Sequence, residues 1–562
     1  MKCLNLRHPL YNYVKGFVFL VFVSVSADLM AEVERDGSSE SPVNLSDVAE
    51  HIKTLASDSF QGRGPLTEGE ELTVTYLAKQ YRDMGLQGAN PKSDDTSPLG
   101  KYLQAVPMAQ ITPDQNMRLN IGELSFASGK DFTARTEQIS TEINLTDSEL
   151  VFVGYGINAP EYQWNDYADV DVKGKTVIVL VNDPGFATQD KTLFTGNAMT
   201  YYGRWTYKYE EAARQGAKAV LIVHETAPAA YPWGVVESSN TGSKYTLVDS
   251  EKNKSKLPIM GWLQLAATEQ IFAQAGLQYQ QLKHKALEKD FVPVSLKQTA
   301  NLTLKNTISR ATSRNVVAKI VGSKYPDEYI LVGAHWDHFG TKQTPDGDII
   351  YNGAVDNASG VAGTLEMARI LMAKHKRNPF ERSILFINFT AEETGLIGSE
   401  QFAKGEIIPT KNMVALVNID GMNVLDKVDY ILQYGDGLSE MEDYLATAAN
   451  EQQRSVKLDP RPQNGLFFRS DHFSMAKQGV PSLLFMSLGD TDPDYIAHKY
   501  HKAADDFSAD WSLGGVEQDI ELMVDITETL ANSRDWPKWK MSSDFKTSRE
   551  ADLTKSENKS AK

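Results

Sequence analysis

Histidine and carboxylate residues gather in one stretch of the chain, "HWDHFGTKQTPDGDIIYNGAVDNASG", which runs from His335 to Gly360. Such residues are the ones that bind metal ions, but a solvated loop has a similar composition. Its aspartates at positions 346 and 348 lie in a glycine-containing turn and are expected to face solvent. The stretch therefore supplies at most one half of a metal site, and the rest of the chain must supply the other.

Candidate partners stand at the ends of apolar runs. "YILVGAHWD" ends in His335 and Asp337, and "VALVNID" ends in Asp420. The run "ILFINFTAEE" ends in the adjacent pair Glu392 and Glu393. Because the carboxyl ends of parallel strands meet in one crevice, these side chains are expected to converge. Two further candidates lie before helices, Asp356 ahead of 359–375 and His501 in "HKYHKAADDF".

This inventory suits hydrolytic metal chemistry. Zinc binds histidine nitrogen and carboxylate oxygen and keeps a position open for water in catalytic sites. The charge of two Zn²⁺ ions would be balanced by Asp356, Glu393, Asp420 and a bridging hydroxide. A carboxylate that binds no metal must accept the proton of the water. Neighbouring side chains point differently, so the pair Glu392–Glu393 can divide these two tasks.

Alternating strand and helix patterns position these residues. Apolar strands bounded by helices predict an α/β fold with a mixed, largely parallel sheet covered by helices on both faces. The segments 314–322 and 328–337 are expected to form a hairpin. Further strands are predicted at 382–393, 412–422 and 480–488, and helices at 46–60, 67–86, 359–375, 396–404, 438–452 and 514–533.

The domain plan has five parts. Residues 1–31 are expected to be a signal peptide, 32–144 the N-terminal part of the catalytic domain, 145–300 an inserted β/α module, 301–538 the catalytic domain and 539–562 a disordered tail. The inserted module contains strand and helix patterns at 173–185 and 207–225 but no dense set of metal-ligand residues.

The N-terminus indicates export. Lys2, Arg7 and Lys15 precede the apolar core "GFVFLVFVSVSA", and Ala31 ends a cleavage-site pattern. We expect a periplasmic or secreted protein with no stable membrane anchor after cleavage. The single cysteine, Cys3, lies in this segment, which excludes a cysteine metal site in the mature protein. The formal net charge of −17 argues against nucleic acid as a partner. Nothing in the sequence fixes the oligomeric state.

Six motifs carry a resemblance to a known family. They are "HWDH", "GAVDNASGVAGTLEMAR", "FTAEETGLIGSEQFA", "NIDGMN", "RSDHFSMAKQGVPSLLF" and "YHKAADDF". In order and spacing they resemble the co-catalytic di-zinc aminopeptidases of clan MH, metallopeptidase family twenty-eight. The resemblance covers about 300–535 and the N-terminal helices, and implies a zinc-exopeptidase fold with an inserted protease-associated (PA) domain.

The resemblance also implies roles for individual residues. His335 and Asp420 would bind the first zinc, Glu393 and His501 the second, and Asp356 would bridge both. Glu392 would be the general base, and a cis peptide is implied between Asp356 and Asn357. The carboxylate of Asp337 would accept the second ring N–H of His335 and fix its tautomer. The implied substrates are peptides with a free N-terminus.

Alternatives stay open for several residues and for the activity. His498 is a second candidate for the last histidine ligand, and His338 and His472 are expected to be wall or structural residues. Tyr500 is a candidate oxyanion donor or a packing residue. The competing activities are a carboxypeptidase or dipeptidase of the same clan, a glutaminyl cyclase-like reaction and a non-catalytic ectodomain.

Overall fold

The computed structural model describes residues 41–488, 494–541, 543–546, 548 and 549. The predicted signal peptide and its cysteine lie outside the described residues. From Pro42 onward the chain forms one compact unit, which contains every candidate site residue named above.

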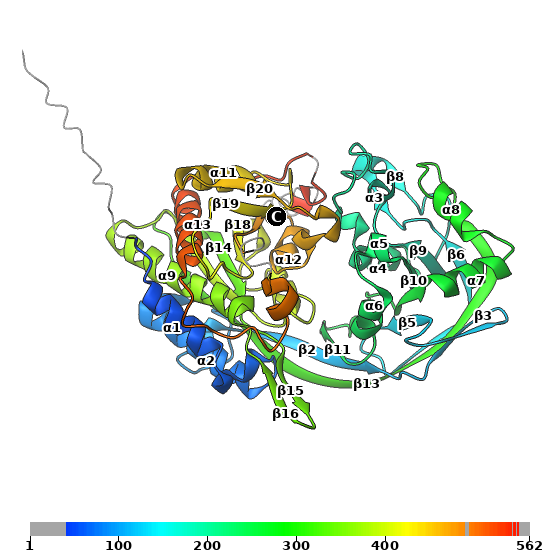
Figure 1. Cartoon of the computed structure of the whole chain (residues 1–562), viewed down its shortest axis with the longest axis horizontal. Helices are drawn as coiled ribbons and strands as arrows, with labels where there is room; N and C mark the ends of the chain where they lie inside the picture. Colours follow the sequence, from blue (N-terminus) through cyan, green and yellow to red (C-terminus); the bar gives the residue numbers. More distant parts are fainter. Residues whose placement is uncertain (1–40, 489–493, 542, 547, 550–562) are drawn as a thin grey trace, which may run out of the picture. The chain divides into compact units, whose positions relative to one another are not determined.

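A mixed sheet carries the candidate site (Figure 1). Its central strands β14, β17 and β18 are parallel, with β17 and β18 on either side of β14. On the far side of β18 follow β21, β19 and β20, and on the far side of β17 follow β13, then β1 and β2, then β11. The bounds are β1 Gln87–Gly88, β2 Leu103–Pro113, β11 Lys244–Leu247, β13 Val294–Ile320, β14 Tyr325–His335, β17 Arg382–Phe389, β18 Met413–Ile419, β19 Tyr430–Tyr434, β20 Ser455–Leu458 and β21 Ser482–Met486.

Helices cover both faces of this sheet, as predicted. Alternate residues of β14 point to opposite faces, so Ile330 and Val332 enter one core and Leu331 enters another. The first core includes residues of α1 (Leu45–Leu55), α2 (Glu68–Met84), α9 (Gly360–Arg377), α11 (Met441–Glu451) and α13 (Gly514–Asn532). The second includes residues of α10 (Ile397–Ala403) and α12 (His472–Lys477). The fold is therefore α/β. The helices agree with the predicted ones to within a few residues, except that α1 ends before residue 60 and that α12 was not predicted.

A second sheet is built mainly from the middle of the chain. Strands β6, β9, β10 and β12 are parallel neighbours in that order, and β5 closes one edge. On the other edge stand β13, β3 and β4. The bounds are β3 Arg118–Ile121, β4 Leu124–Ala127, β5 Phe132–Arg135, β6 Glu142–Phe152, β9 Thr176–Leu180, β10 Ala219–His224 and β12 Ile259–Gln264, with helices α4 Trp205–Arg214, α7 Leu265–Gln274 and α8 Tyr279–Lys285 among the connections.

The two sheets share one long strand. The first part of β13, from Val294 to Lys305, pairs with β6, and the part from Asn306 pairs with β2 and then β17. Figure 1 shows β13 running continuously through both sheets. The second sheet thus starts at Arg118, ahead of the predicted boundary at 145, and the boundary at 300 falls inside a strand. Its first strands have four residues each, too short for a clear alternating pattern. Its assignment as a PA domain stays a prediction.

Two other expectations were wrong. The segments 314–322 and 328–337 do not form a hairpin, because β17 lies between β13 and β14 and pairs with both. The predicted disordered tail begins with packed residues. Trp539 and Phe545 are buried in a hydrophobic cluster with α12, and the Trp539 indole N–H donates to the carbonyl oxygen of Gly479 at 2.8 Å.

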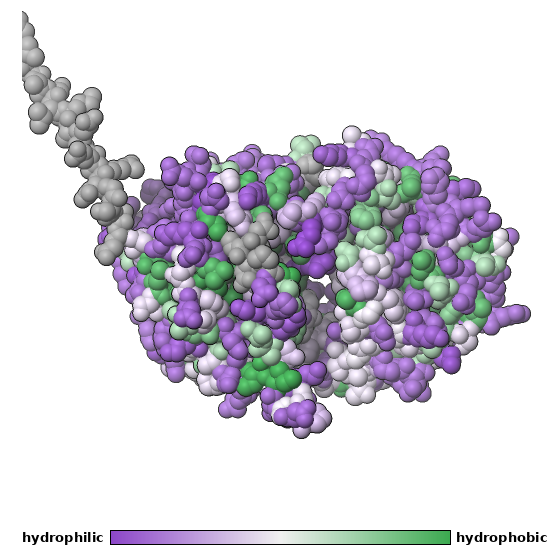
Figure 2. All heavy atoms as spheres, in the orientation of Figure 1, coloured by the Kyte–Doolittle hydropathy of each residue, from purple (hydrophilic) through white to green (hydrophobic). Residues whose placement is uncertain are grey.

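The visible surface is largely polar, with scattered apolar patches (Figure 2). None of the helices in the described residues combines the length and the hydrophobicity that crossing a membrane requires.

Candidate metal centre

The candidate ligands lie where the chain leaves the central strands. His335 is the last residue of β14, and Asp420 follows β18 directly. Glu392 and Glu393 lie three and four residues after the end of β17. Because the three strands run parallel side by side, their ends bring these residues to one edge of the sheet, as predicted.

Asp356 enters from the turn that begins α9. The peptide bond between Asp356 and Asn357 is cis, as the family resemblance implies. The Oδ1 atom of Asn357 accepts the backbone N–H of Gly360 at 3.1 Å and that of Gly421 at 2.9 Å. A side chain at Gly360 would clash, since its Cβ would lie 2.1 Å from Asn357 Oδ1. This packing fixes the start of α9 against the end of β18.

Asp356 faces two separate groups of ligand atoms. Its Oδ1 lies 3.3 Å from Nε2 of His335, and that nitrogen lies 3.2 Å from Oδ1 of Asp420. Its Oδ2 lies 3.2 Å from Nε2 of His501, which in turn lies 3.4 Å from Oε2 of Glu393. One carboxylate thus contributes one oxygen to each of two nitrogen and oxygen clusters. This is the arrangement that a carboxylate bridging two metal ions requires.

His338 belongs to the same centre. Its Nδ1 lies 2.7 Å from Oε1 of Glu393. One nitrogen of His338 and one carboxylate oxygen each from Asp356 and Glu393 all lie within 4.8 Å of one another. Burial lowers the pKa of His338 to about 3, so its ring is neutral. We expected a wall residue, and the structure places it against a candidate ligand. The sequence offered the motif "HWDH" as a signal, but not which of its two histidines would contact Glu393.

Asp337 has a different contact from the one expected. The nearest acceptor to Nδ1 of His335 is the backbone carbonyl oxygen of Asp337 at 3.1 Å, whereas the carboxylate Oδ1 lies 3.7 Å away. That Oδ1 accepts the backbone N–H of Glu392 at 3.0 Å. The backbone carbonyl of Asp337 therefore holds the His335 ring, and its carboxylate anchors the loop that carries Glu392.

The electrostatics reflect a dense group of carboxylates. Burial alone would lower the pKa of His335, yet the charge of Glu392 and contacts with Asp337, Asp356 and Asp420 raise it well above its ordinary value. Burial also favours a raised pKa for Asp356, but contacts with His335 and His501 lower it. Burial raises the pKa of Glu392 well above the usual range, and the charges of Asp420 and Glu393 act in the same direction.

The donor set fits zinc. Imidazole nitrogen and carboxylate oxygen are ligands that Zn²⁺ binds in proteins, and the described residues of this centre contain no thiolate. Three carboxylates packed together repel one another, and cations at the two clusters would remove that repulsion. His335, Asp356 and Asp420 suit one ion, and Asp356, Glu393 and a histidine suit the other.

Neither ligand cluster includes the other residues named from the sequence, which are His498, His472 and Tyr500. His498 contacts Asp494 at 3.1 Å. His472 is buried against Phe467, with ring centres 4.6 Å apart, which agrees with a structural role. The Tyr500 ring stacks on that of His501, with ring centres 3.8 Å apart, and its side chain is 42% exposed.

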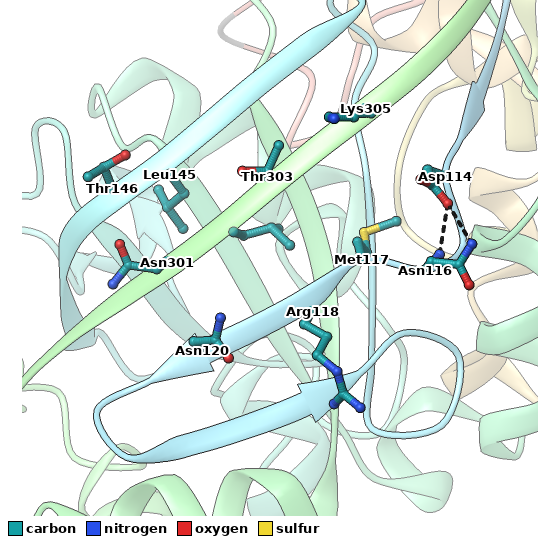
Figure 3. A pocket seen from close by; sticks show the side chains of 11 residues that line it. Asp114, Asn116, Met117, Arg118, Asn120, Leu145, Thr146, Asn301, Thr303 and Lys305 are labelled. Carbon is teal, nitrogen blue, oxygen red and sulfur yellow. Dashed lines mark hydrogen bonds between the residues drawn. The ribbon is translucent and has the colours of Figure 1, made fainter.

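A surface hollow lies elsewhere, on the second sheet (Figure 3). It has a volume of about 500 Å³, and Asn116 donates to Asp114 Oδ1 within its lining. Its lining contains one aspartate and no histidine or glutamate. This hollow therefore lacks the histidine and glutamate ligands that the metal centre gathers.

Residues 315–523 match Peptidase family M28. This part of the chain is an M28 peptidase domain. The M28 segment contains every predicted ligand as well as Glu392 and Asp337.

The chain is also similar to individual proteins. The chain is 26% identical over 365 residues to "Aminopeptidase YwaD" of Bacillus subtilis (strain 168), covering 62% of each protein. It is 41% identical over 106 residues to "Probable zinc metalloprotease" of Pyrenophora teres f. teres (strain 0-1), covering 19% of this chain and 22% of that protein. Both matches thus span less than two thirds of the relative. Among solved structures, the aminopeptidase from Aneurinibacillus sp. strain AM-1 is 21% identical, with 88% of this chain and 96% of that chain covered at a TM-score of 0.48.

Proposed function

We propose that the protein is a zinc-dependent aminopeptidase that binds two Zn²⁺ ions per chain. The observation that carries the proposal is the division of Asp356 between two clusters, with Oδ1 near His335 and Oδ2 near His501. The M28 match and the relatives named as aminopeptidase and zinc metalloprotease support it. The first ion would be held by His335, Asp356 and Asp420, and the second by Asp356, Glu393 and His501, with His338 against Glu393.

The ions would supply Lewis acidity, which polarises the peptide carbonyl and lowers the pKa of a water molecule to about 7. The protein supplies the base. Glu392 accepts a proton from the attacking water at its carboxylate and delivers it to the leaving amine. Its pKa is raised by burial and by Asp420 and Glu393, which brings the carboxyl closer to the range in which it can both accept and donate.

The charge of the centre favours a substrate amine. Asp420 and Glu393 would be neutralised by the ions, but Glu392, which binds no metal in this proposal, leaves a carboxylate for the α-amino group of a peptide N-terminus. A carboxypeptidase instead needs a free cation for the substrate carboxylate. Arg63, whose charge acts on Asp356 and Glu393, is fully buried and bound to backbone carbonyls. It is therefore not available to a substrate, whereas the exposed Arg469, whose Nη2 donates to the carbonyl oxygen of Asn464 at 2.9 Å, keeps the carboxypeptidase as the alternative.

The test uses aminoacyl-p-nitroanilides with the purified mature protein. We expect release of nitroaniline, loss of the activity on treatment with a chelator, and recovery when Zn²⁺ is added. Activity that persists after complete zinc removal would contradict the proposal. A protein that binds zinc but cleaves only peptides with a free C-terminus would instead support the carboxypeptidase.

We also propose that the protein is exported, on the basis of the basic residues and the apolar core within residues 1–31. Expression of the full chain followed by N-terminal sequencing of the mature product tests this. A mature N-terminus at or shortly before residue 32, in the periplasm or medium, is the expected result. An intact N-terminus in the cytoplasm would overturn it.

A further inference from the structure

Arg63 is a buried cation with no described salt bridge, and it lies far ahead of the M28 segment in sequence. We propose that Arg63 is a positioning residue that fixes the spacing of two ligand-bearing loops and thereby sets the metal affinity of the centre. The proposal rests on the proposed function, since it assumes that His335 and Asp356 bind metal.

The guanidinium connects both loops directly. Its Nε donates to the carbonyl oxygen of Trp336 at 2.9 Å, immediately after His335. Its Nη2 donates to the carbonyl oxygen of Gly353 at 2.8 Å, and its Nη1 donates to that of Asn352 at 2.5 Å, shortly before Asp356. Nη1 also donates to Leu55 at the end of α1, at 2.8 Å. One rigid planar group thus sets the separation between the loop of the first histidine and the loop of the bridging aspartate.

The backbone around Arg63 is held in an uncommon conformation. Gln61, Gly62 and Arg63 have φ values of 52°, 63° and 51°, a region that residues other than glycine rarely adopt. A Cβ on Gly62 would lie 2.5 Å from the carbonyl oxygens of Gly340 and Tyr351, at the base of the hairpin β15 (Gly340–Thr344) and β16 (Gly347–Tyr351). Such strain persists where the surroundings over-determine it, often at functional sites.

The loop before Asp356 is held from its other side as well. The Asp505 carboxylate accepts the backbone N–H groups of Val355 and Asp356, each at 3.1 Å, and the Asp505 carbonyl oxygen accepts that of Ala354 at 3.0 Å. Arg63 therefore binds the carbonyl groups of the loop, and Asp505 binds the amide groups that follow. Together they leave the bridging aspartate little freedom to move.

The choice of arginine has a physical reason. A buried charge is costly unless its hydrogen bonds are satisfied, and this guanidinium satisfies four of its donors with carbonyl oxygens. Its positive charge also acts on Asp505, Asp356, Asp337 and Glu393. Lysine would keep the charge but could not bridge the same carbonyls with a planar fork.

The experiment compares Zn²⁺ affinity by competition with a chromophoric chelator, and the visible spectrum of bound Co²⁺. The proteins are the mature wild type, Arg63→Lys, Arg63→Met and the control Arg382→Met. Arg382 is equally buried, and its guanidinium also donates to two backbone carbonyls, those of Leu530 and Asp535. Its Nε also pairs with the Glu328 carboxylate at 2.8 Å, and Arg382 is the first residue of β17, whereas the ligand residues lie at or after the ends of the strands.

We expect at least a tenfold loss of Zn²⁺ affinity and an altered Co²⁺ spectrum in Arg63→Met, a smaller loss in Arg63→Lys, and wild-type metal binding in Arg382→Met. Wild-type affinity and spectrum in both Arg63 variants would overturn the proposal. A variant that folds only when Zn²⁺ is added supports it, and one that stays unfolded with Zn²⁺ counts against it. If the wild type itself binds no zinc, the proposed function fails instead.

Discussion

The Oδ1 atom of Asp337 accepts the backbone N–H of Glu392 at 3.0 Å. Asp337, two residues after His335, therefore anchors the loop that carries Glu392, the proposed base. Asp337 also touches Nδ1 of His335 through its backbone carbonyl, at 3.1 Å. One residue thus couples the orientation of a metal ligand to the position of the base, and several consequences can be measured.

Replacing Asp337 by Ala should remove the acceptor for Glu392 while leaving the backbone contact with His335. We expect kcat to fall by about 10- to 100-fold, as is typical for partners of metal-site residues. Asp337→Asn keeps an oxygen acceptor and should lose less activity than Asp337→Ala. Steady-state kinetics on a leucyl-p-nitroanilide checks this, and equal losses in the two variants would contradict the role of the hydrogen bond.

Glu392→Gln should bind zinc normally and turn over very slowly. The amide cannot accept the proton of the water, so kcat should drop by about 10²–10⁴-fold or more. Metal analysis of the same sample is essential, because loss of zinc would also abolish turnover. A variant with full zinc content and a normal rate would remove Glu392 from the mechanism.

Asp356→Ala should disrupt both metal positions at once, since each oxygen of Asp356 faces a different cluster. Zinc content measured by inductively coupled plasma mass spectrometry should fall from two ions per chain to one or none. The control is Asp346→Ala, at an exposed position of the hairpin turn, which should keep both ions. Retention of two ions by Asp356→Ala would rule out the bridging role.

The second sheet should impose its own pH dependence on stability. Burial raises the pKa of Asp166 from 3.8 to about 7, against the lowering effect of the Ile157 and Trp164 N–H groups. Between about pH 4 and 7 the folded state holds this proton and the unfolded state does not, so Asp166 lowers the free energy of unfolding as pH rises through this window.

Asp166→Asn removes the titrating group, so urea unfolding of this variant should show a weaker fall in stability between pH 4 and 7 than the wild type. Asp169→Asn, at an exposed position nearby, is the matched control and should follow the wild type. An unchanged slope in Asp166→Asn would show that Asp166 does not titrate as its burial implies.

Much of the metal centre could be predicted because its ligands directly follow apolar strands. His335 and Asp420 end or follow β14 and β18, and parallel strand ends meet by geometry. The order of strands in the sheet was harder to predict, because strands that pair can lie far apart in the sequence. The strand predicted at 328–337 follows the one at 314–322 in sequence. In the sheet, however, β17 (Arg382–Phe389) lies between them.

Contacts that depend on three-dimensional packing were not predictable from the sequence. Whether His335 contacts the carbonyl or the carboxylate of Asp337 depends on ring orientation, and the approach of His338 to Glu393 depends on how two loops fold together. No sequence motif of metal binding points to Arg63, because its guanidinium binds backbone carbonyl groups of residues far away in the sequence.

The most direct test of the account is mass-spectrometric analysis of the products from two peptides of identical sequence, one with a free N-terminus and one acetylated. Both carry an amidated C-terminus, so a carboxypeptidase finds no free carboxylate on either. With the zinc-loaded wild type, we predict stepwise loss of N-terminal residues from the free peptide and no cleavage of the acetylated one. Equal cleavage of both peptides would contradict the assignment as an aminopeptidase.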